Sequence, residues 1–269
     1  MKSKRLIVLL SVLAFLTVLI VVNSTLFTLQ KVSVNWLTTK YMLDMNGVKD
    51  YNITEKVELG GSIFLIQKDE ITNSLEKNYP YLRVVSIETK FPNKLVLHTA
   101  ERESLYAVSM GNNTYAILDE MGKVLAKSTY QKIFEGADLG TRPILIDFES
   151  IATNEKDYVV GEFVASDYVK YIINSMSYSL RETSYTPTTS KGVLKSISVV
   201  SQGDRSAVSI KTRNGMVMSI DKFEDYTTSK LMLAFERYNY LHNDGVVDAT
   251  IEVWHNQTTN QILAEEIVG

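Results

Sequence analysis

The sequence contains no cysteine and only three histidines among its 269 residues. Without cysteine the chain cannot form a disulfide framework, a thiolate metal site or a cysteine nucleophile. The histidines, His98, His242 and His255, lie in separate strand-like or loop-like stretches, so a multi-histidine metal site would require them to converge in space. The sequence therefore predicts neither a metal site nor a cofactor site.

Basic residues are too few for a nucleic-acid-binding surface. The chain has 28 lysines and arginines against 31 aspartates and glutamates. Lys2, Lys4 and Arg5 precede a hydrophobic run and no acidic residue occurs before Asp44, so the rest of the chain is more acidic than the formal net charge of −3. Because nucleic-acid binding needs clustered lysine and arginine to displace phosphate counterions, we expect no nucleic-acid partner.

One long hydrophobic run lies near the N-terminus. Residues Leu6–Val22 read LIVLLSVLAFLTVLIVV and include no charged residue. At about 1.5 Å per residue the run is slightly shorter than a hydrocarbon core of about 30 Å, and Leu26, Phe27 and Leu29 extend it. We therefore expect a transmembrane helix over 6–29. By the positive-inside rule, the chain that follows this helix lies outside the cytoplasm.

A cleaved secretory signal also begins with basic residues followed by an apolar run. The run found here is longer than the apolar region of such a signal, which is about 7–15 residues, and residues 23–28 lack an A-x-A-like pattern of small residues. These features favour an uncleaved anchor with residues 1–5 in the cytoplasm. Both interpretations place the body of the protein outside the cytoplasm.

Residues 30–102 are expected to form a small domain of strands and helices. Its expected elements are, in order, a strand at 32–36, a stretch to about Asn46 that is compatible with a helix, a helix from Asp69 to Pro80, and two strands around a turn at 91–94. The helix period of four and the strand period of two bring six residues to one apolar face: Ile71, Leu75, Val85, Ile87, Leu95 and Leu97.

Residues 103–255 are expected to form a β-rich mixed domain. The expected strands are Thr114–Leu118, Lys123–Lys127, Ile144–Ile146, Leu194–Val200, Ala207–Thr212, Met216–Ile220 and Val247–Trp254. The expected packed helices, one of them capped by Ser166 or Asp167, carry the stripes Tyr168, Ile172, Met176, Leu180 and Leu231, Phe235, Tyr238, Leu241. Thr183–Lys191 is expected to be a loop, Asn214-Gly215 a type I′ hairpin turn, and 256–269 a polar C-terminal tail. The predicted class is α+β.

Enzyme motifs are weak or missing. Ser74-Leu-Glu-Lys77 has the S-x-x-K form of penicillin-recognising enzymes, but Lys211-Thr212 is followed by Arg213 where the K-T-G motif needs glycine. The acidic pairs Glu101 with Glu103 and Asp119 with Glu120 lie at strand ends or turns, where carboxylates are ordinary. We therefore expect no catalytic residue and no small-molecule substrate. The alternative that stays open is a membrane-anchored extracytoplasmic cell-wall enzyme of unrecognised type.

Short features follow one another in a fixed order between Gly60 and Glu103. They are a Gly-x-Ile-Phe opening, a Tyr-Pro-Tyr helix stop, a Phe-Pro-Asn turn and a closing Glu-Arg pair, which contribute Gly61, Ile63, Phe64, Pro80, Tyr81, Pro92, Glu101 and Arg102. This run resembles the POTRA domain of the FtsQ/DivIB family of bacterial division proteins. The segments Thr114–Val124, Asn214-Gly215, Lys230-Leu231 and Gly245–Asp248 are also similar to that family.

The resemblance implies a non-enzymatic scaffold with one transmembrane helix, located in the cell membrane at the division septum. Its POTRA domain would assist recruitment to midcell. Its β domain would bind FtsB/DivIC-like and FtsL-like partners and regulate septal peptidoglycan synthesis. Another POTRA-bearing protein, such as an outer-membrane assembly factor, is a second alternative, but such factors lack an inner-membrane anchor.

The expected last strand supplies a candidate partner-binding site made of Asp248, Ala249, Thr250, Ile251, Glu252, Val253 and Trp254. A last strand without a successor is expected to be a sheet edge, and an edge can accept an extended segment of a partner by strand addition. The resemblance also implies binding beside this strand. Trp254 is the expected aromatic anchor of the interface. The alternative is that Trp254 covers the core of its own domain.

Overall fold

The computed structural model of the chain describes residues 2–37, 53, 57–135, 142–149, 154–202 and 205–268. The stretch before Asn46 that is compatible with a helix lies outside these residues. The chain divides into two compact units, Met1–Arg102 and Glu103–Gly269.

The first unit begins with helix α1 (Lys2–Leu26), whose apolar side chains such as Leu13 and Phe15 are exposed. This helix ends at Leu26 and does not extend to residue 29. Thr28 forms an isolated antiparallel bridge with Ser62, and Leu29 is buried in the core of the first unit. No helix in the described part of the chain is long and apolar enough to cross a membrane.

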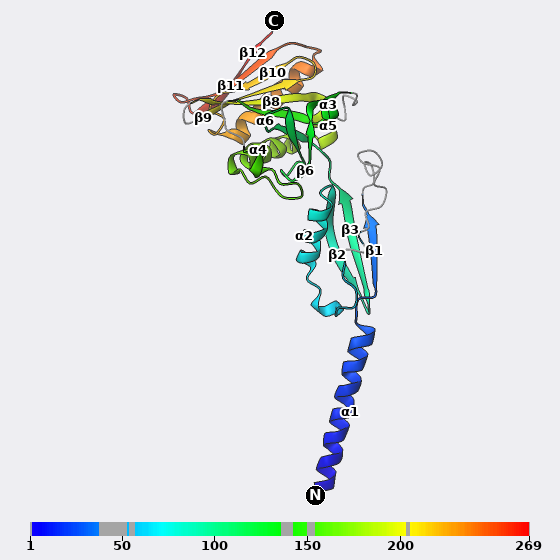
Figure 1. Cartoon of the computed structure of the whole chain (residues 1–269). Helices are drawn as coiled ribbons and strands as arrows, with labels where there is room; N and C mark the ends of the chain where they lie inside the picture. The colour runs from blue at the N-terminus through cyan, green and yellow to red at the C-terminus, as the bar shows by residue number, and fades with distance from the viewer. Residues whose placement is uncertain are drawn as a thin grey trace. The chain divides into compact units, whose positions relative to one another are not determined.

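Among the described residues that follow α1 in the first unit, a three-stranded sheet has the order β1-β3-β2, with α2 packed against β2 (Figure 1). The elements are β1 (Lys31–Trp36), the 3-10 turn η2 (Ile63–Leu65), α2 (Lys68–Asn78), β2 (Leu82–Lys90) and β3 (Lys94–Glu101). The strands β1 and β3 are parallel, and β2 and β3 form an antiparallel hairpin around the Phe-Pro-Asn turn. The buried core consists of Leu29, Ile53, Val57, Leu75, Leu82, Leu95 and Leu97.

The predicted apolar face of this unit is correct except at Val85. Leu75, Leu95 and Leu97 are buried, and Ile71 and Ile87 pack against them. Val85 is 50% exposed, because a β-bulge between Val84 and Ser86 shifts the register of β2. An extra residue in one strand turns its side chain away from the face that strict alternation predicts.

The second unit is built on a nine-stranded mixed sheet in the order β12-β11-β10-β9-β8-β7-β4-β5-β6. Its strands are β4 (Tyr106–Ser109), β5 (Thr114–Leu118), β6 (Val124–Thr129), β7 (Ile144–Glu149), β8 (Leu194–Gln202), β9 (Arg205–Thr212), β10 (Val217–Ile220), β11 (Thr250–Asn256) and β12 (Gln261–Ile267). The pairs β4 with β7, β7 with β8, and β10 with β11 are parallel, and the others are antiparallel. Together with the helices, the two units have an α+β fold, as predicted.

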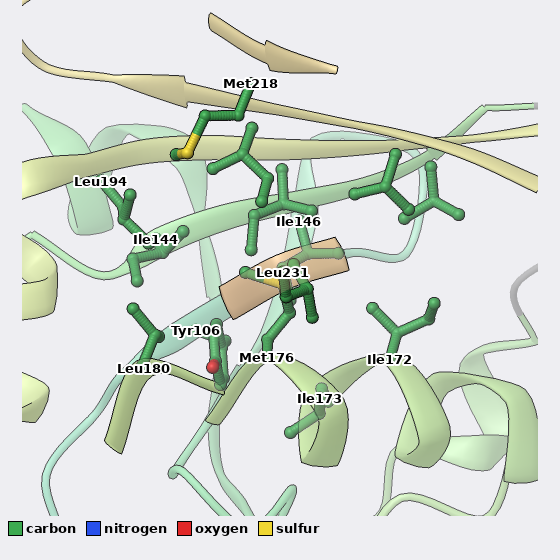
Figure 2. Packing of buried hydrophobic residues seen from close by; sticks show 14 of the residues in the cluster. Tyr106, Ile144, Ile146, Ile172, Ile173, Met176, Leu180, Leu194, Met218 and Leu231 are labelled. Atoms are coloured by element: carbon green, nitrogen blue, oxygen red, sulfur yellow. The ribbon is translucent and has the colours of Figure 1, made fainter. Parts of the chain in front are cut away.

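Helices α4 (Asp167–Glu182) and α6 (Thr227–Asn243) pack against one face of this sheet. In Figure 2 the side chains of Ile172, Met176 and Leu180 on α4 point toward those of the strands. All three are buried, and Ser166 caps the helix by accepting a hydrogen bond from the backbone N–H of Val169. The opposite face is covered at β4 and β5 by the short helix α3 (Tyr130–Phe134).

Two local predictions for the second unit are wrong. The expected loop 183–191 contains the short helix α5 (Pro187–Val193), because Thr186 and Thr189 form a capping box and Pro187 occupies the first turn. The hairpin at Asn214-Gly215 exists, but only Gly215 has a positive φ, and a type I′ turn needs both central residues there. A Cβ on Gly215 would also lie 1.8 Å from Oδ1 of Asp248.

The expected C-terminal tail is the third correction. Residues Gln261–Ile267 form β12, which pairs antiparallel with β11 along its whole length. Strand β11 therefore has a neighbour on each side, β10 and β12, and is not an edge. The outermost strand at this end of the sheet is β12.

Candidate partner-binding site

The last residue of the first unit, Arg102, is buried in an ion pair. Its guanidinium Nη2 lies 2.7 Å from Oε2 of Glu76 on α2, and its Nε donates to the carbonyl of Leu82 at 3.3 Å. The second carboxylate oxygen of Glu76 accepts the backbone N–H of Val84 at 2.9 Å. This network ties α2 to β2 and to the end of β3. Arg102 therefore stabilises the first unit and is not exposed to a partner, and Glu76 is a structural residue that the sequence did not reveal.

The other POTRA-motif residues lie at the turns of the first unit. Ile63 is buried in η2, and the carbonyl of Gly61 accepts the backbone N–H of Leu29 at 2.8 Å. Pro80 and Tyr81 lie between α2 and β2, Pro92 lies in the hairpin turn, and Glu101 ends β3. Phe64 is a large apolar residue of this motif that is 57% exposed. The motif therefore mainly specifies where the elements of this unit begin and end.

The seven residues of the expected partner-binding strand divide into two sets. Ala249, Ile251 and Val253 are buried in the core of the second unit and cannot contact a partner directly. Asp248 and Glu252 are exposed, and Thr250 and Trp254 are half-buried. Alternation along β11 thus leaves Thr250, Glu252 and Trp254 on the face opposite the core.

The hairpin that creates β12 has a recognisable chemical cause. The side-chain Oδ1 of Asn256 accepts the backbone N–H groups of Thr258 and Thr259 at 2.9 and 3.2 Å, which reverses the chain. Asn260, at the end of the turn, has a φ of +55°, a conformation that asparagine adopts more readily than most residues. These turn residues were present in the sequence, but Ala264, Glu265 and Glu266 are weak strand formers and concealed the strand after them.

The outer face of β11 and β12 combines apolar and acidic side chains in cross-strand pairs. Trp254 lies opposite Leu263, and Glu252 lies opposite Glu265. Like charges directly opposite each other in a sheet destabilise it. The two carboxylates therefore form a site where a basic side chain of a partner would relieve the repulsion.

Strand β12 also presents a free edge. Within the described ranges of the chain it pairs with a strand on one side only, so the backbone groups of its other side face away from the sheet. Its residues Ile262 and Ala264 pack toward the core, and Glu266 lies 3.6 Å from Arg237 on α6. The strand is thus held in an extended conformation that can pair with another chain.

A polar and aromatic cluster closes the turn end of this hairpin. The ring of Tyr226, which is 53% exposed, lies 4.5 Å from the ring of His255. Nε2 of His255 and Oδ1 of Asn260 are 3.1 Å apart, and the Tyr226 hydroxyl donates to the same oxygen at 3.5 Å. These residues were not predicted from the sequence, because they come together only when β12 folds back.

Buried Lys230 positions the start of α6 beside this hairpin. Its Nζ donates to the carbonyls of Asp221 and Lys222 at 2.7 and 2.8 Å. Burial lowers the pKa of Lys230 below its ordinary value, because desolvation disfavours the charged amine. The lysine therefore links the end of β10 to the start of α6 through hydrogen bonds.

The residues considered for catalysis lie on several different elements of the two units. Ser74 and Lys77 both lie on the exposed side of α2, and the backbone carbonyl of Ser74 accepts the side-chain amide of Asn78. Asp119 is buried in the turn between β5 and β6, where its carboxylate accepts the backbone N–H groups of Met121 and Lys123. His98, His242 and His255 lie on β3, α6 and β11.

The first unit matches a known family model. Residues 48–102 correspond to the POTRA domain, FtsQ-type. The chain therefore carries an FtsQ-type POTRA domain.

Two curated relatives extend the comparison. The chain is 30% identical over 121 residues to the cell division protein DivIB of Clostridium tetani (strain Massachusetts / E88), which covers 44% of this chain and 41% of that protein. It is 31% identical over 80 residues to the cell division protein DivIB of Clostridium acetobutylicum, which covers 29% and 31%. The matched stretches span less than half the length of either relative. Together with the POTRA match, they confirm the predicted resemblance to the FtsQ/DivIB family.

Proposed function

We propose that the chain is a non-enzymatic scaffold of the bacterial divisome that binds FtsB/DivIC-like and FtsL-like partners and supports septal peptidoglycan synthesis. Its relatives are cell division proteins, and its first unit is an FtsQ-type POTRA domain. The observation that carries the binding role is the free edge of β12 beside the outer face of Trp254 and Leu263.

We propose that α1 anchors this scaffold in the cell membrane with its N-terminus in the cytoplasm. The charge-free run Leu6–Val22 lies within α1, and basic residues precede it. This proposal rests on the sequence, because the described residues by themselves include no helix long and apolar enough to cross a membrane. A helix over Leu6–Leu26 is about 30 Å long at 1.5 Å per residue, which is close to the hydrocarbon thickness. With this orientation both compact units lie outside the cytoplasm, and we propose that they act at the division septum.

The partner is proposed to bind as an added strand. An extended segment pairs with β12 through backbone hydrogen bonds, and its side chains on one face pack over Trp254 and Leu263. The carboxylates of Glu252 and Glu265 select a basic side chain at the neighbouring position of that segment. Strand addition of this kind gives affinity through the backbone and specificity through the side chains of one face.

The test measures binding of the extracytoplasmic segment of a DivIC-like partner to the full chain in nanodiscs. Trp254→Ala should weaken binding about 30-fold, the effect of a central interface residue worth about 2 kcal/mol. Glu265→Lys should also weaken it, because the site then repels a basic side chain. Tyr240→Ala is the matched control, since Tyr240 is a 58% exposed aromatic residue on α6.

Unchanged affinity in both variants would overturn the site. A large loss of thermal stability in Trp254→Ala, together with unchanged affinity, would instead assign Trp254 to the packing of its own unit. Loss of affinity in Tyr240→Ala equal to that in Trp254→Ala would place the interface on α6.

A further inference from the structure

Three phenylalanine rings gather where α1 joins the rest of the first unit. The ring centroids of Phe27 and Phe64 are 5.2 Å apart, those of Phe64 and Phe91 are 5.4 Å apart, and those of Phe27 and Phe91 are 6.4 Å apart. Phe64 and Phe91 are 57% and 61% exposed, and the adjacent Leu65 is 79% exposed. The core of this unit does not use these rings, although they come from three separate segments. This set, Phe27, Phe64, Leu65 and Phe91, is referred to as the aromatic cluster.

The aromatic cluster is fastened to the end of α1 without a linker. The helix ends at Leu26, and the carbonyl of Phe27 already accepts the backbone N–H of Ile63 at 2.8 Å. The backbone N–H of Gln30 donates to the carbonyl of Asn93 at 2.9 Å, and the Asn93 side chain donates back to Gln30 at 2.9 Å. The segment Phe27–Gln30 that follows α1 is therefore hydrogen-bonded to both loops that carry the exposed rings.

A row of three lysines crosses the small sheet at the same end. Lys94 opens β3 directly after the turn of Phe91, and it lies in register with Lys31 on β1 and with Lys90 on β2. Residues in register share a face, so the three amines are neighbours, and of these Lys90 lies 3.7 Å from Glu88. Neighbouring like charges repel, and an anionic surface would relieve that repulsion. This set, Lys31, Lys94 and Lys90, is referred to as the lysine row.

We infer that the aromatic cluster and the lysine row form a lipid-binding surface that seats the first unit on the outer leaflet of the membrane. The inference rests on the proposed anchoring by α1. If Leu6–Leu26 spans the hydrocarbon, Phe27 lies at its outer boundary, and the headgroup layer beyond it is only about 5–8 Å thick. Rings within 6.4 Å of Phe27 then lie in that layer. The lysine row contacts anionic headgroups there.

Site-directed spin labelling tests this surface directly, because the native chain has no cysteine to remove. The full chain is placed in liposomes of phosphatidylcholine and phosphatidylglycerol with one label at a time, at Leu65→Cys, Leu13→Cys or Val85→Cys. The last is the matched control, a 50% exposed apolar residue in the same unit. Labels at Leu65→Cys and Leu13→Cys should be shielded from an aqueous nickel relaxant and accessible to oxygen, whereas the label at Val85→Cys should be accessible to nickel.

The three labels distinguish the lipid-binding surface from the membrane anchor on which it depends. A label at Leu65→Cys as accessible to nickel as that at Val85→Cys, with Leu13→Cys shielded, would overturn the lipid-binding surface and leave the anchor intact. Accessibility to nickel at Leu13→Cys as well would overturn both.

A separate pair of variants tests the contribution of the lysine row. Each lysine near an anionic surface strengthens association about five-fold, so Lys31→Gln with Lys94→Gln should raise the nickel accessibility of the label at Leu65→Cys. Replacing phosphatidylglycerol with phosphatidylcholine should do the same. Lys195→Gln with Lys211→Gln, the same charge change at exposed lysines of the second unit, should leave it unaltered. No change in the first variant would overturn the role of anionic headgroups.

Discussion

The buried ion pair between Glu76 and Arg102 allows a quantitative test of what holds the first unit together. The two side chains are 11% and 6% exposed, and the closest nitrogen and oxygen are 2.7 Å apart. Arg102→Met leaves the Glu76 carboxylate buried without its guanidinium, and Glu76→Gln leaves the arginine without its carboxylate. Removing one partner of a buried pair destabilises a protein by about 3–5 kcal/mol, because the remaining charge is not compensated.

The double variant is expected to differ from the sum of the single variants. Glu76→Gln with Arg102→Met leaves no buried charge at this site, and the glutamine oxygen can still accept the N–H of Val84. Its loss of stability should therefore be smaller than the sum of the two single losses by about 3 kcal/mol or more. Glu88→Gln is the control, since Glu88 pairs with Lys90 at 3.7 Å with both side chains more than half exposed. That change should lower the free energy of unfolding by at most about 1 kcal/mol.

The two tryptophans make the first unit observable by itself. Trp36 lies in β1 of the first unit and Trp254 in β11 of the second, so Trp254→Phe leaves Trp36 as the fluorescent reporter of the first unit. Urea unfolding of the full chain in this background gives the free energy of unfolding for each variant. Single losses below about 1 kcal/mol, or losses that simply add in the double variant, would refute the role of the pair.

Two further predictions concern packing and pH. Leu75→Ala should lower the free energy of unfolding by about 2–5 kcal/mol because Leu75 is buried, whereas Val85→Ala should change it by less than about 0.5 kcal/mol. Urea unfolding followed by the fluorescence of Trp36 measures both. Equal effects of the two variants would contradict the bulge in β2. Burial raises the pKa of Tyr185 from its ordinary value of 10 to about 12, so its contribution to stability is complete below pH 10 and is lost as pH rises through about 12. Tyr185→Phe should therefore lose less stability than the native chain between about pH 9 and about pH 11 in urea titrations, and an identical loss would contradict this.

Much of the fold follows from periodicity in the sequence. Spacings of three and four residues predicted the buried faces of α4 and α6, including Met176 and Phe235. Alternation predicted most strands of both sheets. These signals are strong because a long helix or a half-buried strand repeats its pattern several times.

The missed features depend on few residues or on contacts distant in sequence. Strand β12 follows a turn set by Asn256, but its own alanine and glutamates do not favour a strand. The bulge at Val85 and the helix α5 each depend on one or two local interactions. The partner of Arg102 could not be chosen among many glutamates without the three-dimensional structure. The candidate site therefore has its free edge on β12, one strand further out than the predicted β11, and it still includes Trp254.

The central claim is that this chain works in the divisome, and its position in living cells tests that claim most directly. A fluorescent protein fused to the full chain, expressed at native level in its host, should concentrate in a band at midcell during division. The account predicts that this band appears as septation begins and disappears after the daughter cells separate. A diffuse signal around the whole cell periphery throughout the cell cycle would contradict it.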